Sequence, residues 1–330
     1  MEKSVNIEKG YVDMPIDKNL DIRAAIQQLK KEKNALIMAH YYQNNDIQDI
    51  ADYVGDSLAL AQHAAKTDAD IIVLCGVHFM GETAKILCPQ KKVLVPDMNA
   101  GCSLADSCPA DAFGQFVKEH PGYTVISYVN TTAEVKAYTD IVVTSTNAKQ
   151  IVESFPKDEK ILFGPDRNLG NYINSITGRN MLLWDGACHV HEQFSVEKIV
   201  ELKKRYPHAL VLAHPECKKF VLELADHIGS TASLLKFATQ SECKQFIVAT
   251  ESGIIHEMVK QNPFKEFIPA PPEDSTCACN ECNFMRLNTL QKLYNCLKYE
   301  MPAIEVEKSI QVKAVKSIHR MLKVSEELGL

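Results

Sequence analysis

The chain has 330 residues, of which 46% are hydrophobic and 24% charged, the proportions of a folded globular protein with more than one structural unit. Its longest strongly apolar run, residues 71–77, is too short to cross a bilayer, and its charged first 21 residues lack the apolar stretch of a secretory signal. We therefore expect a cytoplasmic protein that does not bind membranes. The formal net charge of −6 and the lack of a basic block argue against nucleic acid as a partner.

Short runs rich in Val, Ile and Leu alternate with amphipathic helical runs along most of the chain. Most of the short runs are apolar without alternation, which is typical of parallel strands covered by helices on both faces. Alternating strands and helices indicate the α/β class. The predicted strands are residues 35–42, 71–77, 92–97, 124–130, 140–146, 160–166, 181–186, 209–216 and 245–252.

Four kinds of landmark recur in the same order in each third of the chain. A strand ends in a polar cluster, a Ser/Thr turn opens a helix, a strand ends near a glycine, and a cysteine follows a late strand. Successive members are 84 to 94 residues apart. The four sets are His40, Asn130 and His214; Ser57, Ser145 and Ser230; Gly76, Gly164 and Gly253; and Cys102, Cys188 and Cys282.

This period predicts three similar three-layer α/β/α units with short parallel sheets around a pseudo-threefold axis. The alternative is that strands spaced by about 20–40 residues, as in any α/β chain, imitate a loose period. We expect an N-terminal leader segment over residues 1–20, α/β units over 21–105, 106–190 and 191–300, and a C-terminal helix over 301–330. That helix lies outside the repeat and is expected to pack across the first unit.

All four landmarks lie at the carboxyl ends of strands, where parallel α/β sheets bind their ligands. Eleven cysteines in a reducing compartment favour metal ligation or thiol chemistry over disulfides. One cysteine from each unit (Cys102, Cys188 and Cys282) suits a 4Fe–4S cluster, one per chain, held by three thiolates. The remaining iron would be an open Lewis acid that assists dehydration. A zinc site is the weaker alternative, because only Cys279 and Cys282 have C-x-x-C spacing.

The other cysteines most simply serve as small buried apolar residues. Apolar patterns favour that role for Cys75, Cys88, Cys243 and Cys296, while Cys108 and Cys217 stay undecided with a structural role preferred. Cys277 and Cys279 crowd the third ligand and could compete with it or form a strained redox pair.

The Ser/Thr turns have two interpretations. Ser and Thr are ordinary N-caps in helices of every kind. Three helix starts facing one cavity would instead supply N–H groups and positive dipole ends for a small polyanion that carries carboxylate or phosphate. No G-x-G-x-x-G or Walker-type motif occurs, so neither a dinucleotide nor a nucleoside triphosphate is expected.

The polar strand ends bring acids, bases and amides that could transfer protons, although each histidine there could equally be structural. These residues are His40, Tyr42, Tyr128, Asn130, His214 and Glu216. His189 and His191 flank Cys188 and could support it without binding a metal themselves.

An ordered set of motifs over roughly residues 20–300 resembles the A-type quinolinate synthases, the iron–sulfur transferases of pyridine nucleotide (NAD) biosynthesis. The motifs are MAHYYQN (38–44), GDSL (55–58), CGVHFMGETAKIL (75–87), GCSLADSC (101–108), SYVNTTAEVKA (127–137), VVTSTNA (142–148), WDGACHVHEQF (184–194), HPE (214–216), GSTASLL (229–235), IVATESGI (247–254) and CNFMRLNTLQ (282–291). The resemblance implies three related units around a central cluster. It also implies condensation of iminoaspartate (iminosuccinate) with dihydroxyacetone phosphate to give quinolinate, phosphate and two waters.

The resemblance also assigns residues, with cluster ligation falling on Cys102, Cys188 and Cys282. Tyr42 and Glu216 look like its acid–base residues, with His214 and Tyr128 as further catalytic candidates. Its substrate-binding positions fall on His40, Ser57, Tyr128, Asn130, Ser145, His214, Glu216 and Thr231, and we add the neighbouring Ser230. Some relatives carry C-x-x-C-x-x-C where this chain has CACNEC at 277–282, which leaves a regulatory disulfide unsupported here.

Two rival interpretations remain at this point. A diphthamide-type enzyme also gathers one cysteine from each of three units, but it would cleave S-adenosylmethionine, and its motif set does not occur in the chain. A non-catalytic iron–sulfur or zinc sensor would keep the three cysteines but would not need the polar clusters at the strand ends. The resemblance also leaves room for transient contact with the enzyme that supplies iminoaspartate.

Overall fold

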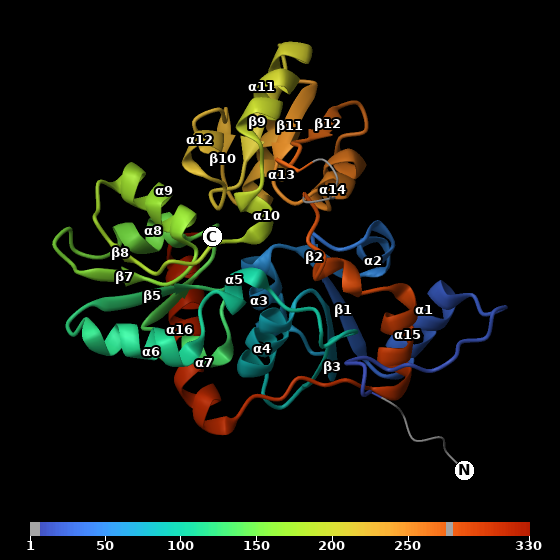
Figure 1. Cartoon of the computed structure of the whole chain (residues 1–330). Coiled ribbons are helices and arrows are strands. Elements are labelled where there is room, and N and C mark those ends of the chain that lie inside the picture. The colour runs from blue at the N-terminus through green and yellow to red at the C-terminus, as the bar shows by residue number, and fades with distance from the viewer. Residues whose placement is uncertain (1–6, 275–279) are drawn as a thin grey trace. The chain divides into compact units, whose positions relative to one another are not determined.

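The computed structural model describes residues 7–274 and 280–330. Its strands form three four-stranded sheets in which all described neighbours run parallel (Figure 1). The strand orders are β2-β1-β3-β4, β6-β5-β7-β8 and β10-β9-β11-β12, so each sheet repeats one connection pattern. The predicted α/β class with three similar units is thereby confirmed. None of the described helices is long and apolar enough to span a membrane.

The chain divides into two compact units. The first contains the described residues up to Cys102 together with Asn283–Val315, and it holds the first sheet. Its strands are β1 (Ala35–His40), β2 (Tyr53–Gly55), β3 (Ile71–Cys75) and β4 (Lys92–Leu94). Its helices are α1 (Ile22–Glu32), α2 (Asn45–Ile50), α3 (Ser57–Lys66), α4 (His78–Leu87), the short 3-10 helix η1 (Met285–Leu287) and α15 (Leu290–Tyr299).

The second unit contains the described residues of Ser103–Cys282 and Lys316–Leu330. Around its first sheet, the strands are β5 (Thr124–Tyr128), β6 (Ile141–Val143), β7 (Ile161–Phe163) and β8 (Leu182–Leu183), and the helices are α5 (Ser103–Asp106), α6 (Ala110–Glu119), α7 (Ala133–Lys136), α8 (Ala148–Glu153), α9 (Arg167–Thr177) and α10 (His189–Glu192). Around its second sheet, the strands are β9 (Leu210–Ala213), β10 (His227–Ile228), β11 (Gln245–Ala249) and β12 (Glu266–Pro269), and the helices are α11 (Val196–Arg205), α12 (Lys219–Leu222), α13 (Thr231–Gln240) and α14 (Ile254–Gln261).

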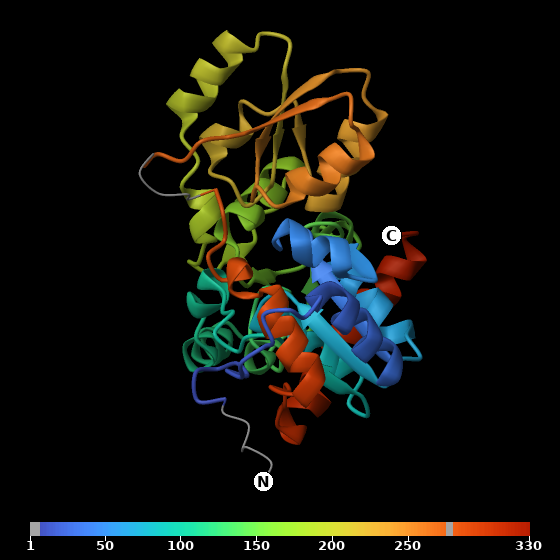
Figure 2. The same cartoon turned by 90° about the vertical axis from the view of Figure 1, so that its right-hand side faces the viewer.

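Apolar side chains on both faces of each sheet explain this layering. In the first sheet, Ile37 and Val73 face a buried cluster that includes Ile26 of α1 and Leu293 of α15. In the third sheet, Val211 and Ile247 share a cluster with residues of α11 and α12, and Figure 2 shows α11 (yellow) across this sheet from α13 and α14 (orange). Since burying one such side chain contributes about 1.5–3 kcal/mol, the unbroken apolar runs are the main source of stability.

One aspartate marks the repeat in every sheet. The N–H groups of Ile37, Val125 and Val211, in the first strand of each set, donate to an aspartate fifteen residues later at 2.8–2.9 Å. The aspartate N–H donates back to the carbonyl of the same strand residue in each case. The three acceptors are Asp52, Asp140 and Asp226. This reciprocal pair fixes the first strand against the start of the second, and it recurs too faithfully to be chance.

The C-terminal helix α16 (Lys308–Glu327) corrects one expectation. Near its start, Gln311 donates to the carbonyl of Lys85 in the first unit. Further along, Ser317 donates to the carbonyl of Lys136, and the side chain of Asn147 donates to Ser325. The second half of the helix therefore packs within the second unit, and the prediction that the helix packs across the first unit is wrong for that half.

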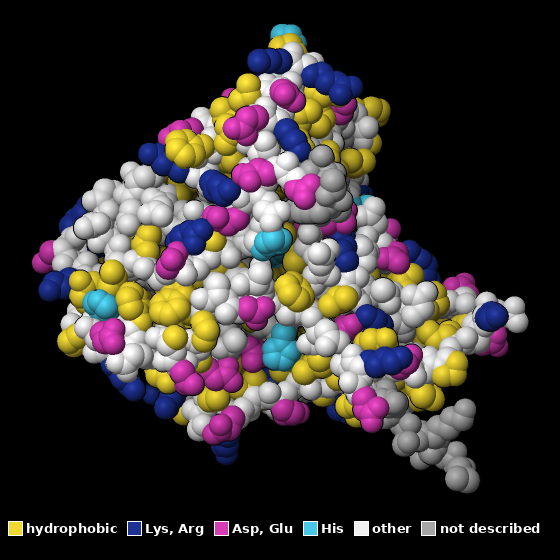
Figure 3. All heavy atoms as spheres, viewed as in Figure 1, with side chains coloured by type: hydrophobic (Ala, Val, Ile, Leu, Met, Phe, Trp, Pro, Cys, Tyr) yellow, Lys and Arg dark blue, Asp and Glu magenta, His cyan; other side chains and the backbone are white. Residues whose placement is uncertain are grey.

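All nine predicted strand runs contain an observed strand, but several end two or three residues before the predicted limit. The short strands β2, β10 and β12 lie outside the nine predicted runs. Each has only two to four residues and lies at the edge of its sheet, so it carries no long apolar run. On the face shown in Figure 3, basic and acidic side chains are interspersed.

Candidate active site

A buried polar cluster lies in the second unit, at the carboxyl ends of β5 and β9. Glu216 is only 3% exposed, and its Oε1 accepts a hydrogen bond of 2.6 Å from the hydroxyl of Tyr128. Its Oε2 lies 3.1 Å from Nδ1 of His191, and Nδ1 of His214 lies 3.7 Å from Oε1. The structure thus brings together three predicted residues, Tyr128, His214 and Glu216, and adds His191.

Two buried carboxyl groups in this region have opposite charge preferences. Burial by itself raises the pKa of Glu216. The nearby His191 and His214, together with hydrogen bonds from His191 and Tyr128, have a larger combined effect in the opposite direction, and the pKa falls to about 2. Burial and the charge of Glu216 together raise the pKa of Asp166 well above its usual value. At neutral pH Glu216 is therefore ionised in a water-poor setting, in the protonation state that can accept a proton.

Cys188 is held from two sides at the start of α10. Its backbone N–H donates to Oδ2 of Asp166 at 2.9 Å, and its Sγ lies 3.2 Å from Nδ1 of His191. The other ring nitrogen of His191 lies 2.9 Å from the hydroxyl of Thr250. His191 thus contacts the cysteine sulfur, whereas His189 is exposed and its ring contacts Gln193.

Cys282 has a comparable support. Its N–H donates to Oε1 of Glu251 at 3.1 Å, and Glu251, 1% exposed, also accepts the N–H of Gly253. Cys102 lies in the first unit, directly before α5, just as Cys188 directly precedes α10. All nine described cysteines carry thiols rather than disulfides. Cys277 and Cys279, with their predicted competition or redox pairing, lie outside the described residues.

Asp166, Thr250 and Glu251 are not among the site residues predicted from the sequence. Each directly follows or lies close behind the carboxyl end of β7 or β11, the edge at which the predicted site residues lie. Position on that edge is the signal that could have found them. Asp166 also caps α9 through the N–H groups of Asn168 and Leu169.

In the first unit, His40 and Tyr42 form a local pair. His40 ends β1 and is 4% exposed, and its Nδ1 accepts the N–H of Tyr42 at 3.2 Å. The two rings meet edge to face with centroids 4.4 Å apart. The same arrangement recurs where the N–H of Glu216 donates to Nδ1 of His214 at 3.4 Å.

These contacts correct the sequence alignment of the repeat. His40 and Tyr128 are the last residues of β1 and β5, and His214 directly follows β9, so these three are equivalent. Asn130 therefore corresponds to Tyr42 and Glu216 rather than to the histidines. In the same way Thr250, directly after β11, takes the position of Gly76, because Ala39 pairs with Cys75 and Ala213 with Ala249. Gly253 lies three residues further on, as the N-cap of α14. Asn130 Oδ1 is buried and accepts no hydrogen bond from the described residues.

The N-cap interpretation of the turns holds only in part. Ser230 caps α13 by accepting the N–H of Ser233, and Thr231 is the first residue of that helix. Ser57 is the first residue of α3, which is capped by Asp56 instead. Ser145 lies three residues before the first residue of α8, and Asn147 occupies the N-cap position of that helix. Ser145 and Ser230 line one cavity of about 390 Å³ that also holds Lys149 and Lys236.

The cysteines expected to be structural are buried, with one exception. Burial raises the pKa of Cys75 and of Cys108 to about 12, which suits inert thiols. The exception is Cys243, which is half-buried in the turn before β11, with Sγ near the carbonyl oxygens of His208 and Gln245. The fully buried cysteines are Cys75, Cys88, Cys108, Cys217 and Cys296.

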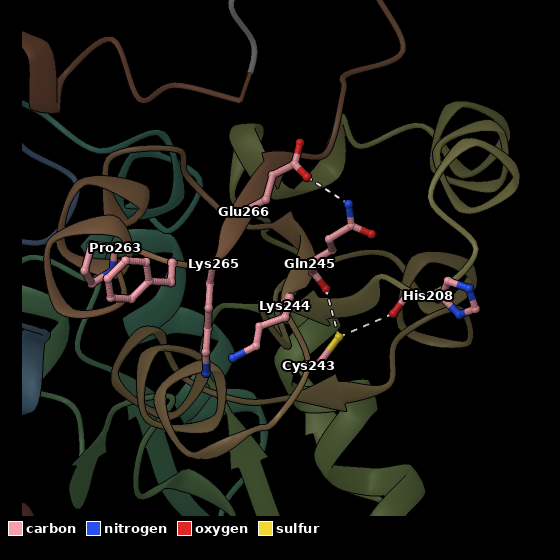
Figure 4. Close-up of a pocket in the computed structure, with 8 residues that line it drawn as sticks. His208, Cys243, Lys244, Gln245, Pro263, Lys265 and Glu266 are labelled. Carbon is pink, nitrogen blue, oxygen red and sulfur yellow. Dashed lines mark hydrogen bonds between the residues drawn. The ribbon is translucent and has the colours of Figure 1, made fainter.

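Figure 4 shows the cavity of about 640 Å³ that Cys243 lines with His208, Lys244 and Lys265. It lies at the amino ends of β11 and β12, whereas Glu216 lies beyond the carboxyl end of β9. Because parallel α/β sheets bind ligands at carboxyl ends, this cavity does not belong to the candidate site.

The chain matches a family described as Quinolinate synthetase A protein over residues 24–323. A quinolinate synthase from Thermosynechococcus vestitus is 58% identical over 306 residues, which cover 93% of this chain and 96% of the relative. One from Chloroherpeton thalassium is 57% identical over 307 residues (93% and 95%), and one from a Synechococcus strain is 56% identical over 318 residues (96% and 98%).

Proposed function

The chain belongs to the quinolinate synthase family and makes quinolinate for NAD biosynthesis, and we propose that it does so by condensing iminoaspartate with dihydroxyacetone phosphate, with release of phosphate and two waters. The buried Tyr128–Glu216–His214 cluster is the single observation that best supports this chemistry. Isomerisation, dehydration and closure of a pyridine ring all require positioned proton transfer, which these side chains can provide.

Glu216 acts as the general base in this proposal. It is ionised, shielded from water and hydrogen-bonded to a phenol that can share a proton with it. His214 is oriented by the N–H of Glu216 and presents its ring beside the carboxylate. Tyr42 serves as the second acid–base group, from the equivalent position in the first repeat.

Substrate binding follows from the charge of the reactants. A phosphate and two carboxylates suit the N–H groups at helix starts, so we assign anion binding to Ser57 at α3, to Ser145, and to Ser230 and Thr231 at α13. Among the described residues, the buried Asn130 Oδ1 lacks a donor, and it would accept one from a substrate hydroxyl or amine. His40 completes the set of binding residues.

The donor set also fits the predicted cofactor. Cys188 and Cys282 each have their backbone N–H fixed by a buried carboxylate, and Cys102 precedes a helical turn in the same way as Cys188. We propose that these three thiolates hold one 4Fe–4S cluster per chain. When bound, such a cluster supplies an iron without a cysteine ligand, a Lewis acid that polarises oxygen and favours loss of water.

The test is to purify the full chain without oxygen and measure iron, sulfide and quinolinate formation. We expect about four irons per chain and turnover of both substrates. Cys188→Ala should lose both, while Cys243→Ala, a cysteine remote from the site, should keep both. Full quinolinate production by a cluster-free Cys188→Ala chain would refute the cluster's role. The cytoplasmic location and a transient contact with the supplier of iminoaspartate stay predictions.

A further inference from the structure

Three side chains of the second unit form a compact group of possible metal ligands. Sγ of Cys188, Nδ1 of His191 and a carboxylate oxygen of Glu216 all lie within 4.8 Å of one another. Nδ1 of His191 is at the centre, 3.2 Å from the sulfur and 3.1 Å from Oε2 of Glu216. Among the described residues, this is the one group of three or more such side chains with this spacing.

The spacing and chemistry suit zinc. A tetrahedral zinc ion lies about 2.3 Å from sulfur and about 2.0 Å from nitrogen and oxygen, which places its ligands about 3.3–3.6 Å apart. The two distances to Nδ1 of His191 need shifts of only a few tenths of an ångström. Sγ of Cys188 and the carboxylate oxygen lie within 4.8 Å of each other, so this pair must close by up to about 1.2 Å. One thiolate, one imidazole and one carboxylate are too soft a set for magnesium or calcium, and three protein ligands leave the fourth position open.

The surroundings already orient each ligand. Nε2 of His191 pairs with the hydroxyl of Thr250, which directs Nδ1 towards the other two ligands. Oε1 of Glu216 accepts from Tyr128, which leaves Oε2 for a metal. Such outer hydrogen bonds are typical of built metal sites and raise their affinity.

We propose that, in the chain without its cluster, Cys188, His191 and Glu216 bind one Zn²⁺ ion, and that this ion excludes the cluster because both require the Cys188 thiolate. The second part rests on the proposed function; the first part does not. Zinc displaces the thiol proton of Cys188 to solvent and occupies the carboxylate that acts as the base. Zinc at this site therefore blocks quinolinate formation both by preventing cluster assembly and by occupying Glu216.

Metal binding is tested on the full chain produced in iron-depleted medium and kept reduced. Zinc affinity is measured by competition with a chromophoric chelator, and cobalt(II) serves as the spectroscopic probe. We expect one tight site per chain, with a tetrahedral cobalt spectrum and one thiolate charge-transfer band. His191→Gln should weaken zinc binding by more than about 100-fold and Thr250→Val by about 10-fold, since the latter removes only an outer partner.

Two control variants test whether other cysteines, rather than Cys188, bind the zinc. Cys243→Ser and Cys282→Ser should leave zinc affinity within about twofold of the parent chain. If Cys282→Ser abolishes binding while His191→Gln retains it, the metal belongs to the 277–282 segment and the proposal is overturned. Circular dichroism identifies variants that do not fold, and the mild Thr250→Val variant keeps the test decisive if His191→Gln is among them.

Exclusion of the cluster is tested by reconstituting the chain with iron and sulfide, with and without one equivalent of zinc. We expect zinc to suppress iron incorporation at least tenfold in the parent chain. Normal iron incorporation beside bound zinc overturns the exclusion. Failure to incorporate iron even without zinc would instead count against the proposed function, and the zinc titration stands apart from that result.

Discussion

Glu216 keeps its charge in a position where burial alone would remove it. The carboxylate is buried beside two histidines and a tyrosine, and their combined effect lowers its pKa despite the cost of desolvation. Its partner Asp166 shows the opposite result, because it lies near that charge and has no cation of comparable influence among the causes of its shift. The neighbouring groups thus shift the pKa values of these two nearby acids in opposite directions.

Replacing Glu216 should therefore affect catalysis more than folding. Glu216→Gln keeps the shape and the hydrogen bond from Tyr128 but cannot accept a proton, so we expect kcat to fall by about 100-fold or more. Quinolinate formation measured without oxygen gives this number. The exposed Glu223→Gln is the matched control and should retain parental kcat. A Glu216→Gln chain with more than about a tenth of parental kcat would exclude Glu216 as the base.

At the scale of elements, much of the architecture could be predicted from the sequence. Unbroken apolar runs identified nine of the strands, because parallel strands bury both faces. The edge strands β2, β10 and β12 were not predicted, since two to four residues carry too little pattern. The repeat was predicted correctly, but single landmarks were displaced by two or three residues, as for Asn130 and Gly253. Those landmarks share a chemical type with the other members of their sets, whereas strand register determines which positions are equivalent.

The reciprocal aspartate pair gives an element-scale prediction. Asp140→Ala removes the acceptor of the Val125 N–H in a buried strand, so the free energy of unfolding should fall by about 1–3 kcal/mol. Asp140→Asn keeps an acceptor oxygen and should lose less. Urea unfolding followed by circular dichroism measures both, with the exposed Asp158→Ala as control. Equal stability of Asp140→Ala and Asp158→Ala would show that the pair does not support the strand.

His227, in β10, gives a pH prediction. Its ring stacks on Phe237 at 4.3 Å, and burial lowers the pKa of the imidazole below 6.5. The unfolded chain then binds a proton more readily than the folded one, so this contribution to stability is present above pH 6.5 and lost as pH falls through the folded pKa. His227→Phe keeps the stacking but cannot titrate. Its unfolding free energy should decline less than that of the parent chain from about pH 8 to about pH 5. Parallel declines would show that folding does not lower the pKa of His227.

At the scale of the whole molecule, the candidate residues are divided between the two compact units. The first unit carries His40, Tyr42, Ser57 and Cys102, and the second carries the remaining candidates. The chain leaves the first unit directly after Cys102 and returns directly after Cys282. Sequence spacing could identify these cysteines as equivalent, and position at a strand end could mark Asp166, Thr250 and Glu251 as candidates. Which group each of the three contacts depends on side-chain positions across loops, which no local pattern encodes.

A buried lysine links the far end of the chain to a binding loop. Nζ of Lys136 donates to the carbonyls of Val129 and Thr131, on either side of Asn130, while its own carbonyl accepts from Ser317 of α16. Lys136→Met removes both loop contacts at similar volume, so Asn130 should lose its fixed position. We expect KM to rise at least tenfold with a smaller change in kcat, measured by steady-state kinetics.

The matched control for this change is the exposed Lys160→Met, which should leave both constants unchanged. An unaltered KM in a folded Lys136→Met chain would show that the loop is held by other contacts. A fall in kcat alone would place the lysine's influence on the chemical step instead of on binding.

The outermost strands of all three sheets are two to four residues long. Any open sheet margin exposes unpaired backbone groups that can recruit a strand from another molecule and begin aggregation. Edge strands of two to four residues offer too few consecutive backbone donors and acceptors to pair with a strand from another molecule. In the part of the chain that the structure describes, none of the six sheet margins is therefore long enough to seed a fibril.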